Sequence, residues 1–472
     1  MFKEAEAFLG NDTVVGIELI HKAGSDREYQ RILTPTTSYI LCKNEHVAEN
    51  ESFFYFTTIF NTLQLPVPTI HCISADRKHY LLSDNGRAAL LDVVLKQGHT
   101  EEVKQLYQKS LKQLAKLQLL GDAKIDYSHC FAAKQFDAQS VLADLNYFKY
   151  YFLDLHQLVY DKPGLNREFE QLAQEVNAIP TQHFMFRDFQ GRNILIHDGE
   201  PCFIDYQGGM KGPLQYDVAS LLWQAKAELP ETWKQELFDF YTAEVQQYRD
   251  IDVSQFQYEY SRIVLVRLLQ VLGAYGLRGL IEKRSHFLSS IPQGLSNLDK
   301  WIQQFDLTSY PILEKVILQL TQKEFIQKYS AVKANQDTKL KVRISSFSYK
   351  KGIPQDESGN GGGFVFDCRG VLNPGRYEEY KKLTGRDKPV IDFLESKTRI
   401  HDFLSAAKQA VDISIEDYLA RGFEHLMVSF GCTGGQHRSV YSADAMAKHL
   451  KEKYNLDTIV THIEQESKGW VN

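Results

Sequence analysis

The spacing of apolar and polar positions divides the first 330 residues into a short strand-rich part and a longer helical part. Apolar runs at 14–20, 39–43 and 79–83 are typical of strands. Phenylalanines three or four residues apart over 48–64 indicate a helix with an aromatic face that packs in a core. We therefore expect residues 1–83 to form a small lobe of strands with one main helix.

Helices dominate the next stretch, residues 84–330. Apolar residues recur every three to four positions, as in amphipathic helices, over residues 103–117, 141–152, 230–248, 256–277 and 312–328. Between the second and third of these, Asn193–Ile196 and Cys202–Ile204 have the pattern of short strands, and His197–Glu200 has the composition of a tight turn. The pattern thus predicts a helical lobe with one inserted β-hairpin.

The pattern changes after residues 331–337, a polar and aperiodic stretch that we interpret as a linker. Strands and one helix then alternate, with strand patterns at 340–347, 364–367 and 425–430 and an amphipathic helix at 399–419. Such alternation favours a parallel sheet. The expected architecture is a bilobal α+β domain followed by a smaller α/β domain, residues 338–472, with a mainly parallel sheet.

Composition limits the classes of protein to consider. The 472 residues are 43% hydrophobic and 24% charged, as in globular chains, and the net charge of -6 argues against extensive nucleic-acid binding. Six cysteines include no Cys-x-x-Cys pair, so neither a zinc site nor a disulfide framework is indicated. The first residues do not resemble a signal peptide, and no apolar run approaches the length of a membrane span. We therefore expect a cytoplasmic protein without a membrane partner.

Three oxygen-bearing side chains come together if the hairpin forms. Asp188 precedes it, Asn193 begins its first strand and Asp205 follows its second strand. Each residue alone has an ordinary explanation as a turn cap, a loop residue or the end of a strand. Together they favour phosphoryl transfer, in which a carboxylate deprotonates an acceptor hydroxyl and Mg²⁺, held by few protein oxygens, binds the phosphates.

The segment between the first two predicted strands offers groups for phosphate binding. It is a turn-rich loop, residues 21–32, that contains Gly24, Ser25, Arg27 and Arg31. A loop over ATP presents backbone N–H groups and guanidinium charges to the phosphates. The alternative is an ordinary hairpin turn with solvated charges. We interpret the four residues as candidates for ATP binding.

Lys43 is a further candidate for ATP binding. It ends the strand Ile-Leu-Cys-Lys, an order similar to the Val-Ala-Ile-Lys strand of protein kinases. Glu49 or Glu51, at the start of the following helix, would be its partner. The alternative is a solvated lysine.

A family resemblance rests on two motifs, RDFQGRN and FIDYQGGMKGPLQYDVASLL. They resemble those of aminoglycoside-phosphotransferase-like kinases, and among these the N-acetylmuramate/N-acetylglucosamine anomeric kinases of AmgK type. The resemblance implies a kinase-like fold, ATP and Mg²⁺ as cofactors, Asp188 as catalytic base, and Asn193 and Asp205 as magnesium ligands. It also implies that Arg187 and Asp217 support the catalytic loop.

The chain departs from this family pattern at two points. Phe186 stands where the family usually has histidine, and Gly208-Gly209 replaces an Asp-Ala pair. We expect the first change to matter little for the chemistry and the second to alter the acceptor pocket. Arg267, on an otherwise apolar helix, either meets a carboxylate or phosphate of the substrate or forms an internal ion pair.

A second candidate site lies in the C-terminal domain. The strand at 425–430 runs into a glycine-rich turn and then a helix, which is the arrangement of an anion cradle. Arg438 supplies a guanidinium for phosphate, and Thr433 and Ser439 supply hydroxyls. Cys432 and Arg438 also have the Cys-x5-Arg spacing of cysteine phosphatases, although no histidine precedes the cysteine and no general-acid loop is evident.

Residues 338–472 resemble the C-terminal domain of RapZ, through SFSYKKGIPQD, FDCRGVLNPGRYEEYKKLTGRDKPVIDFLE and GCTGGQHRSVY. That family binds glucosamine-6-phosphate and, in some bacteria, a small regulatory RNA. The resemblance assigns to a phosphosugar cradle Cys432, Thr433, Gly434, Gly435, His437 and Arg438. Gln436 and Gly375 replace a usual lysine and histidine. RNA binding by the basic stripe Lys339, Lys341 and Arg343 is the alternative to a solvated sheet edge.

The most direct expectation is ATP-dependent phosphorylation of a sugar hydroxyl. The resemblance points to the anomeric position of N-acetylmuramate or N-acetylglucosamine, in cell-wall recycling, with a regulatory C-terminal domain that binds a phosphosugar. One alternative is a kinase for another alcohol, such as an aminoglycoside, choline or homoserine, which an acidic acceptor pocket would favour. The other is a non-enzymatic RapZ-like adaptor or RNA-binding regulator.

Overall fold

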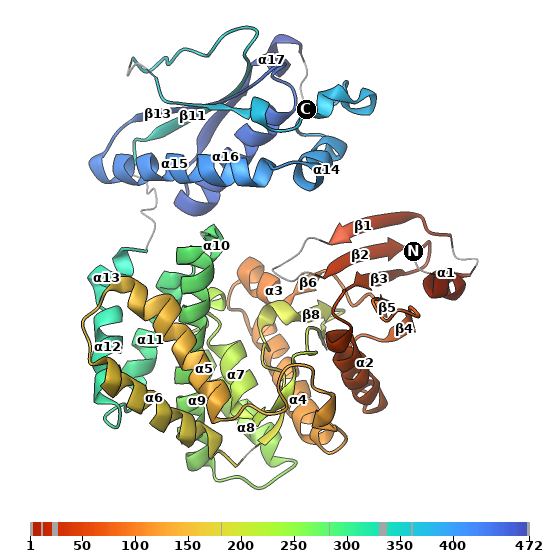
Figure 1. Ribbon diagram of the computed structural model, residues 1–472, viewed down its shortest axis with the longest axis vertical. Coiled ribbons are helices and arrows are strands. Elements are labelled where there is room, and N and C mark those ends of the chain that lie inside the picture. The colour runs from red at the N-terminus through yellow and green to blue at the C-terminus, as the bar shows by residue number, and fades with distance from the viewer. Residues whose placement is uncertain are drawn as a thin grey trace. The chain divides into compact units, whose positions relative to one another are not determined.

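The chain divides into two compact units, Met1–Tyr329 and Ser330–Asn472, which we describe separately (Figure 1). The computed structural model describes residues 3–10, 13–20, 27–180, 182–282, 284–329, 338–359 and 362–469. The predicted linker 331–337 and two of the predicted ATP-binding residues, Gly24 and Ser25, lie outside these ranges.

The small lobe of the first unit is a five-stranded antiparallel sheet in the order β1-β2-β3-β5-β4. Its strands are β1 (Gly16–Ile20), β2 (Glu28–Leu33), β3 (Ser38–Lys43), β4 (Ile70–Ile73) and β5 (His79–Ser83). Two helices accompany it, α1 (Lys3–Leu9) and α2 (Val47–Thr62). The helix predicted over 48–64 is confirmed, and Phe53, Phe56 and Phe60 are buried as its aromatic face.

The predicted loop over residues 21–32 was wrong for its second half. Glu28–Leu33 forms β2, the strand between β1 and β3, and pairs with both. Ladder hydrogen bonds on both sides satisfy its polar backbone, and Ile32 is fully buried. The polar residues that suggested a loop are accommodated because one of them, Arg31, is neutralised by Asp84 beyond the end of β5.

The large lobe is mainly helical. Its longer helices are α3 (Leu90–Gln97), α4 (Glu101–Asp122), α5 (Ala138–Phe148), α6 (Lys162–Asn177), α7 (Gln215–Leu222), α8 (Glu231–Gln246), α9 (Val253–Tyr275), α11 (Ile291–Gln304) and α12 (Pro311–Leu320). Two short helices complete it, α10 (Ser285–Leu288) and α13 (Lys323–Gln327). The single helix expected over 312–328 is two helices, because α12 ends at Leu320 and α13 begins at Lys323.

Helix α9 lies at the centre of this lobe, against α5, α7 and α11 (Figure 1). Within the described residues, Val253–Ile281 is the one helical segment long and apolar enough, by length and composition, to cross a membrane. The expectation that no apolar run approaches that length was wrong. The structure gives the segment another explanation, because 61% of its most apolar window is buried inside the unit.

The predicted hairpin is confirmed. Strands β8 (Ile194–His197) and β9 (Glu200–Phe203) pair antiparallel, and the short strand β6 (Ala88–Ala89) adds to β8. Asp198 and Gly199, with φ of 50° and 74°, form the two-residue turn, which is the left-handed pair that such hairpins favour. Nearby, β7 (Gln182–Met185) pairs with β10 (Met210–Pro213). The segment 186–193 thus connects a strand of one small sheet, β7, to a strand of the other, β8.

The second unit is a four-stranded sheet in the order β12-β13-β11-β14, and every described pairing in it is parallel, as expected. Its elements are β11 (Lys341–Ser348), β12 (Phe364–Asp367), α14 (Lys388–Lys397), α15 (Ile400–Arg421), β13 (His425–Cys432), α16 (Arg438–Tyr454), β14 (Thr458–His462) and α17 (Ile463–Ser467). Two residues of the basic stripe, Lys341 and Arg343, lie on β11, an inner strand rather than the expected sheet edge, and Lys339 lies just before it. Arg343 and Lys339 pair with Glu357 and Glu424.

Candidate active site

Asp188, Asn193 and Asp205 lie together in the large lobe. The Nδ2 atom of Asn193 donates to the backbone oxygen of Asp188 at 2.9 Å and lies 3.5 Å from Oδ2 of Asp205. The hairpin produces this proximity, because the backbone N–H of Ile204 bonds to the carbonyl of Asn193 at 3.0 Å, just before Asp205. The side chains of Asn193 and Asp205 thus lie close enough to bind one ligand together.

The backbone is strained at Asp205 and at Arg187, the residue before Asp188. Arg187 and Asp205 have φ of 76° and 66°, in the left-handed region that side chains other than glycine rarely adopt. Such conformations persist only where the surroundings impose them, and they concentrate at functional sites. The guanidinium of Arg187 donates to Tyr216 Oη at 2.7 Å and to Asp144 Oδ1 at 2.6 Å. These bonds hold the residue immediately before Asp188.

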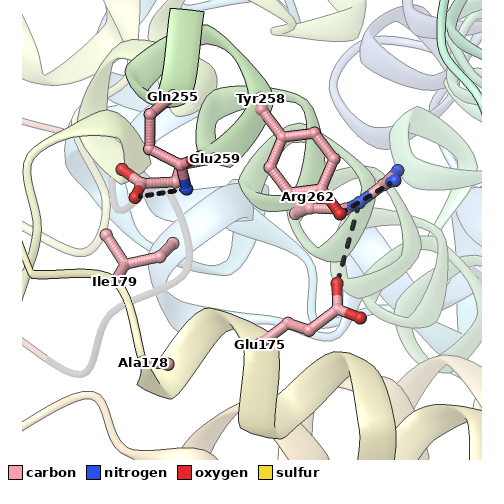
Figure 2. A pocket seen from close by; sticks show the side chains of 7 residues that line it. All are labelled: Glu175, Ala178, Ile179, Gln255, Tyr258, Glu259 and Arg262. Carbon is pink, nitrogen blue, oxygen red and sulfur yellow. Dashed lines mark hydrogen bonds and ion pairs between the residues drawn. The ribbon is translucent and has the colours of Figure 1, made fainter. Parts of the chain in front are cut away.

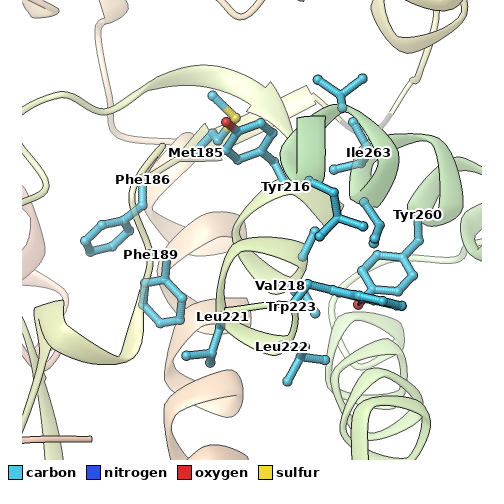
Figure 3. Packing of buried hydrophobic residues seen from close by; sticks show 14 of the residues in the cluster. Met185, Phe186, Phe189, Tyr216, Val218, Leu221, Leu222, Trp223, Tyr260 and Ile263 are labelled. Carbon is cyan, nitrogen blue, oxygen red and sulfur yellow. Dashed lines mark hydrogen bonds between the residues drawn. The ribbon is translucent and has the colours of Figure 1, made fainter. Parts of the chain in front are cut away.

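Asp217 on α7 holds the loop that contains Asp188 through hydrogen bonds. Its carboxylate is fully buried and accepts the backbone N–H groups of Phe186 and Arg187, at 2.8 and 3.1 Å, and Nε2 of Gln118 at 3.0 Å. Phe186 and Phe189, on either side of Asp188, pack against each other and against Phe203, in the cluster of buried residues that also includes side chains of α7 and α9 (Figure 3). Phenylalanine at 186, where histidine was expected, thus anchors the loop through apolar contacts.

We predict that Asp217→Asn lowers the free energy of unfolding by about 2–4 kcal/mol, since an amide leaves at least one buried N–H group facing another donor. Urea unfolding monitored by fluorescence measures this loss. Asp239→Asn, on the exposed face of α8, is the matched control and should change stability by less than about 0.5 kcal/mol. Equal effects of the two substitutions would contradict the role of Asp217.

The same carboxylate predicts a pH dependence. Burial raises the pKa of Asp217 to about 7, above the value of about 4 in an unfolded chain. A raised folded-state pKa stabilises the fold fully below the unfolded pKa, and this contribution is lost as pH rises toward 7. The stability difference between wild type and Asp217→Asn should therefore be larger at pH 5 than at pH 8, and an unchanged difference would contradict the titration.

Two arginines flank the Asp188 carboxylate. Arg192 Nη2 lies 2.7 Å from Oδ2 and Arg267 Nη2 lies 3.2 Å from Oδ1. Burial acts to raise the pKa of Asp188, but the charges of Arg192 and Arg267 outweigh it and keep this pKa below its ordinary value. Arg267 also donates to Ser220 Oγ at 2.8 Å. The internal ion pair weighed for Arg267 thus exists, and its partner is Asp188 itself.

Arg27 enters the site from the small lobe. It is 5% exposed, and its guanidinium pairs with Glu49 on α2 and, at 3.1 Å, with Oδ1 of Asp205. Lys43, by contrast, is 41% exposed and lies 3.7 Å from Glu45. The partners expected for Lys43 were wrong, since Glu49 binds Arg27 and Glu51 binds Arg77.

Arg31 lies away from this cluster. Its Nε is 2.5 Å from Oδ2 of Asp84, and Nη2 donates to the carbonyl of Gly86 at 3.1 Å. It therefore fixes the turn at 84–86, where the chain leaves the small lobe. Of the five residues predicted to bind ATP, the structure brings Arg27 into contact with one proposed magnesium ligand, Asp205.

Gly208-Gly209 stands where the family has an Asp-Ala pair, and packing explains the glycine at 209. A Cβ on Gly209 would lie 2.3 Å from the ring of Phe184, so the usual alanine cannot fit beside this phenylalanine. Gly208 faces open space.

The residues present fit a magnesium ion that takes most of its ligands from phosphate and water. Among the described residues, no group of three or more His, Cys, Asp or Glu side chains forms an all-protein metal cage. One amide oxygen from Asn193 and one carboxylate from Asp205 match the small protein share that Mg²⁺ accepts beside a nucleotide.

Most of the residues predicted to form the anion cradle of the second unit are buried. Cys432, Gly435, His437, Arg438 and Ser439 are buried, whereas Thr433 and Gly434 are exposed. His437 Nε2 lies 2.8 Å from the carbonyl of Tyr380, and Arg438 Nη1 donates to the carbonyls of Arg369 and Val371.

The two departures from the RapZ pattern have structural roles in this unit. Gln436, in place of lysine, donates to the carbonyls of Lys381 and Leu383 at 2.9 and 2.7 Å. A Cβ on Gly375 would lie 3.1 Å from the ring of His437, so a side chain at 375 would crowd this ring. Both residues fit the way the loop packs in this chain.

A pocket that the sequence did not indicate opens between α6 and α9 (Figure 2). Its volume is about 210 Å³, and Glu175 and Arg262 face each other across it at 3.9 Å. None of the predicted site residues lines it.

Comparisons with known proteins assign a family to each unit. Residues 16–251 match the sequence model of the phosphotransferase enzyme family, and residues 340–466 match that of the RapZ C-terminal domain.

Curated relatives are described as nucleotide-binding proteins. One, from Bifidobacterium adolescentis, is 40% identical over 125 residues, covering 26% of this chain and 39% of the relative. Another, from Alkaliphilus oremlandii, is 33% identical over 174 residues, covering 36% of this chain and 58% of the relative. The chain thus spans about two fifths of the length of the first of these relatives.

Solved structures are similar at low identity. An ethanolamine kinase of Plasmodium vivax gives a TM-score of 0.43 at 12% identity, covering 63% of this chain and 83% of that one. The choline kinase LicA from Streptococcus pneumoniae gives 0.38 at 11% identity, covering 67% and 97%.

Proposed function

We propose, for a chain that belongs to the phosphotransferase enzyme family, that it transfers the γ-phosphate of ATP to a sugar hydroxyl. The observation that carries the proposal is that Asn193 contacts both the backbone of Asp188 and the carboxylate of Asp205, beside strained backbone at Arg187 and Asp205. A carboxylate beside a pair of oxygen ligands is the arrangement that kinase chemistry requires.

In this proposal Asp188 orients the acceptor hydroxyl and receives its proton as the oxygen attacks phosphorus. Its lowered pKa keeps it ionised at neutral pH, ready to accept a hydrogen bond from the hydroxyl. Asn193 and Asp205 would hold Mg²⁺, which supplies charge neutralisation at the phosphates. Asp217 and Arg187 position the loop, and Arg27 presents its guanidinium to the phosphate side of Asp205.

The acceptor side of Asp188 is basic, which favours a neutral or anionic acceptor. Arg192 and Arg267 contact the carboxylate. Partial burial and the charge of Arg192 lower the pKa of Lys226, which adds a third basic group nearby. Cationic acceptors such as aminoglycosides or choline would meet repulsion there. N-acetylmuramate, a sugar acid, and N-acetylglucosamine, its neutral counterpart, fit this charge pattern.

We predict that N-acetylmuramate and N-acetylglucosamine are phosphorylated with at least a tenfold higher kcat/KM than choline or kanamycin, in an ATP-consumption assay. Arg192, which is 46% exposed beside Asp188, tests the charge directly. Arg192→Gln should lower kcat/KM for the acidic sugar about tenfold more than for the neutral sugar, since one charge-assisted hydrogen bond is lost only with the former. A preference for a cationic acceptor would contradict the assignment.

We further propose that the RapZ-like unit binds a hexosamine phosphate and adjusts the kinase. The support is the glycine-rich turn between β13 and the N-terminus of α16, a position where the helix dipole and backbone N–H groups generally favour an anion. Isothermal titration of the full chain with glucosamine-6-phosphate tests the binding.

A further inference from the structure

The turn between β13 and α16 contains more than an anion cradle. Its sequence, Cys-Thr-Gly-Gly-Gln-His-Arg-Ser over residues 432–439, places five residues between Cys432 and Arg438 and a hydroxyl directly after the arginine. Cys432 ends β13, an inner strand of the parallel sheet, and α16 begins at Arg438. A cysteine at this point lies where the carboxyl end of a strand meets the positive end of a seventeen-residue helix.

The Cys432 thiol has the surroundings of a thiolate. Its Sγ lies 3.1 Å from Oγ of Ser439, and both side chains are buried. Burial acts to raise the pKa of Cys432. Hydrogen bonds from the side chain and backbone of Ser439, the charge of Arg438 and a hydrogen bond from the backbone of Gln436 outweigh it and hold this pKa below its ordinary value.

Cys368 provides the contrast within the same sheet. It directly follows β12, the strand that pairs with β13, and its Sγ contacts Ser442 Oγ at 3.7 Å. Burial raises the pKa of Cys368 to about 12. The pKa values of two buried cysteines, one at the end of β13 and one directly after β12, are thus shifted in opposite directions, and the hydrogen bonds of the loop after Cys432 account for the difference.

Arg438 gives an independent indication of a ligand. It is 3% exposed, and Nη1 is fixed by the carbonyls of Arg369 and Val371, at 3.2 and 2.6 Å. Its Nε is buried and has no hydrogen-bond partner among the described residues. An unpaired buried charged donor costs free energy. A phosphate oxygen is the acceptor that the free edge of a guanidinium binds well.

We propose that residues 432–439 hydrolyse phosphate monoesters through a phosphocysteine, an activity separate from the proposed kinase. Sγ of Cys432 attacks phosphorus, and an S–P bond forms as the P–O ester bond breaks. The leaving oxygen takes a proton from water and departs as the alcohol. A water molecule then attacks phosphorus and breaks the S–P bond, which releases inorganic phosphate and restores the thiolate. Arg438 holds the phosphoryl oxygens, and Ser439 stabilises the sulfur as it leaves.

The test is hydrolysis of p-nitrophenyl phosphate by the full chain, without ATP. We expect turnover that orthovanadate inhibits and that Cys432→Ser lowers at least a thousandfold. Cys368→Ser, the matched control, should stay within twofold of wild type, and thermal unfolding checks that both variants are folded. No vanadate-sensitive hydrolysis, or an active Cys432→Ser protein, would overturn the proposal.

A second measurement does not depend on turnover. Iodoacetamide labelling at pH 7, read by mass spectrometry, should modify Cys432 faster than Cys368, and inorganic phosphate should protect Cys432. Equal labelling of the two cysteines, or no protection by phosphate, would show that the loop does not hold an anion against a thiolate.

Discussion

Replacing Asp188 by asparagine should lower kcat roughly 10³-fold and leave the dissociation constant for ATP within about threefold of the wild-type value, as expected for loss of a general base. The substitution keeps the size of the side chain. The contact through which the loop meets Asn193 uses the backbone oxygen of residue 188, so it is retained. Steady-state kinetics and isothermal titration with a non-hydrolysable ATP analogue measure the two quantities.

Asp198→Asn is the matched control for this change. Asp198 lies in the hairpin turn of the same lobe, its side chain is 90% exposed, and asparagine tolerates its left-handed backbone. This variant should retain wild-type kcat. A lowered pKa for Asp188 also predicts that the wild-type rate does not titrate with this group near neutral pH. An Asp188→Asn protein with near-normal turnover would refute its assignment as the base.

The second large effect concerns Arg27. Arg27→Met should lower kcat/KM for ATP about 10²-fold, because two charge-assisted contacts, to Glu49 and Asp205, are lost beside the phosphate site. Lys43→Met should change this value less than about twofold, since its side chain is a solvent-exposed partner of Glu45. Initial rates at varied ATP concentration measure both.

A conservative variant distinguishes a role of Arg27 in binding the nucleotide from a merely structural role. Arg27→Lys keeps the positive charge and should recover part of kcat/KM, and the loss should fall mainly on the nucleotide rather than on the acceptor. If Lys43→Met abolishes activity and Arg27→Met does not, the strand lysine holds the phosphates after all. If no wild-type activity is found with any acceptor, the proposed function itself fails, whereas nucleotide titration still reports on Arg27.

The hairpin and its flanking polar residues were predictable because they are local in sequence. Asp198-Gly199 dictates a tight turn, and the lengths of the two strands place Ile204 opposite Asn193, so that Asp205 is the next residue along. The partner of Glu49 was not predictable in this way. The partner of Glu49 depends on which side chains of the sheet reach α2. The sequence of β3 favoured Lys43, whereas the structure has Arg27, the residue just before β2.

Contacts between distant segments explain the other differences. Arg267 follows Asp188 by 79 residues, and the ion pair between them exists because α9 passes beside the loop. The basic residues of β11 suggested a solvated sheet edge. Strand β14 follows β11 by more than a hundred residues, and its pairing makes β11 an inner strand. Local patterns identified most of the elements, whereas the pairing of distant elements decided which side chains meet.

The central position of α9 also has a consequence for how the chain is made. Two helices that cover it, α5 and α7, precede it in the sequence, but α11 follows it. Until residues 291–304 have left the ribosome and packed, α9 lacks one of the helices that cover it, and its sequence has the hydropathy of a membrane segment. The large lobe therefore cannot enclose its own centre before α11 has left the ribosome.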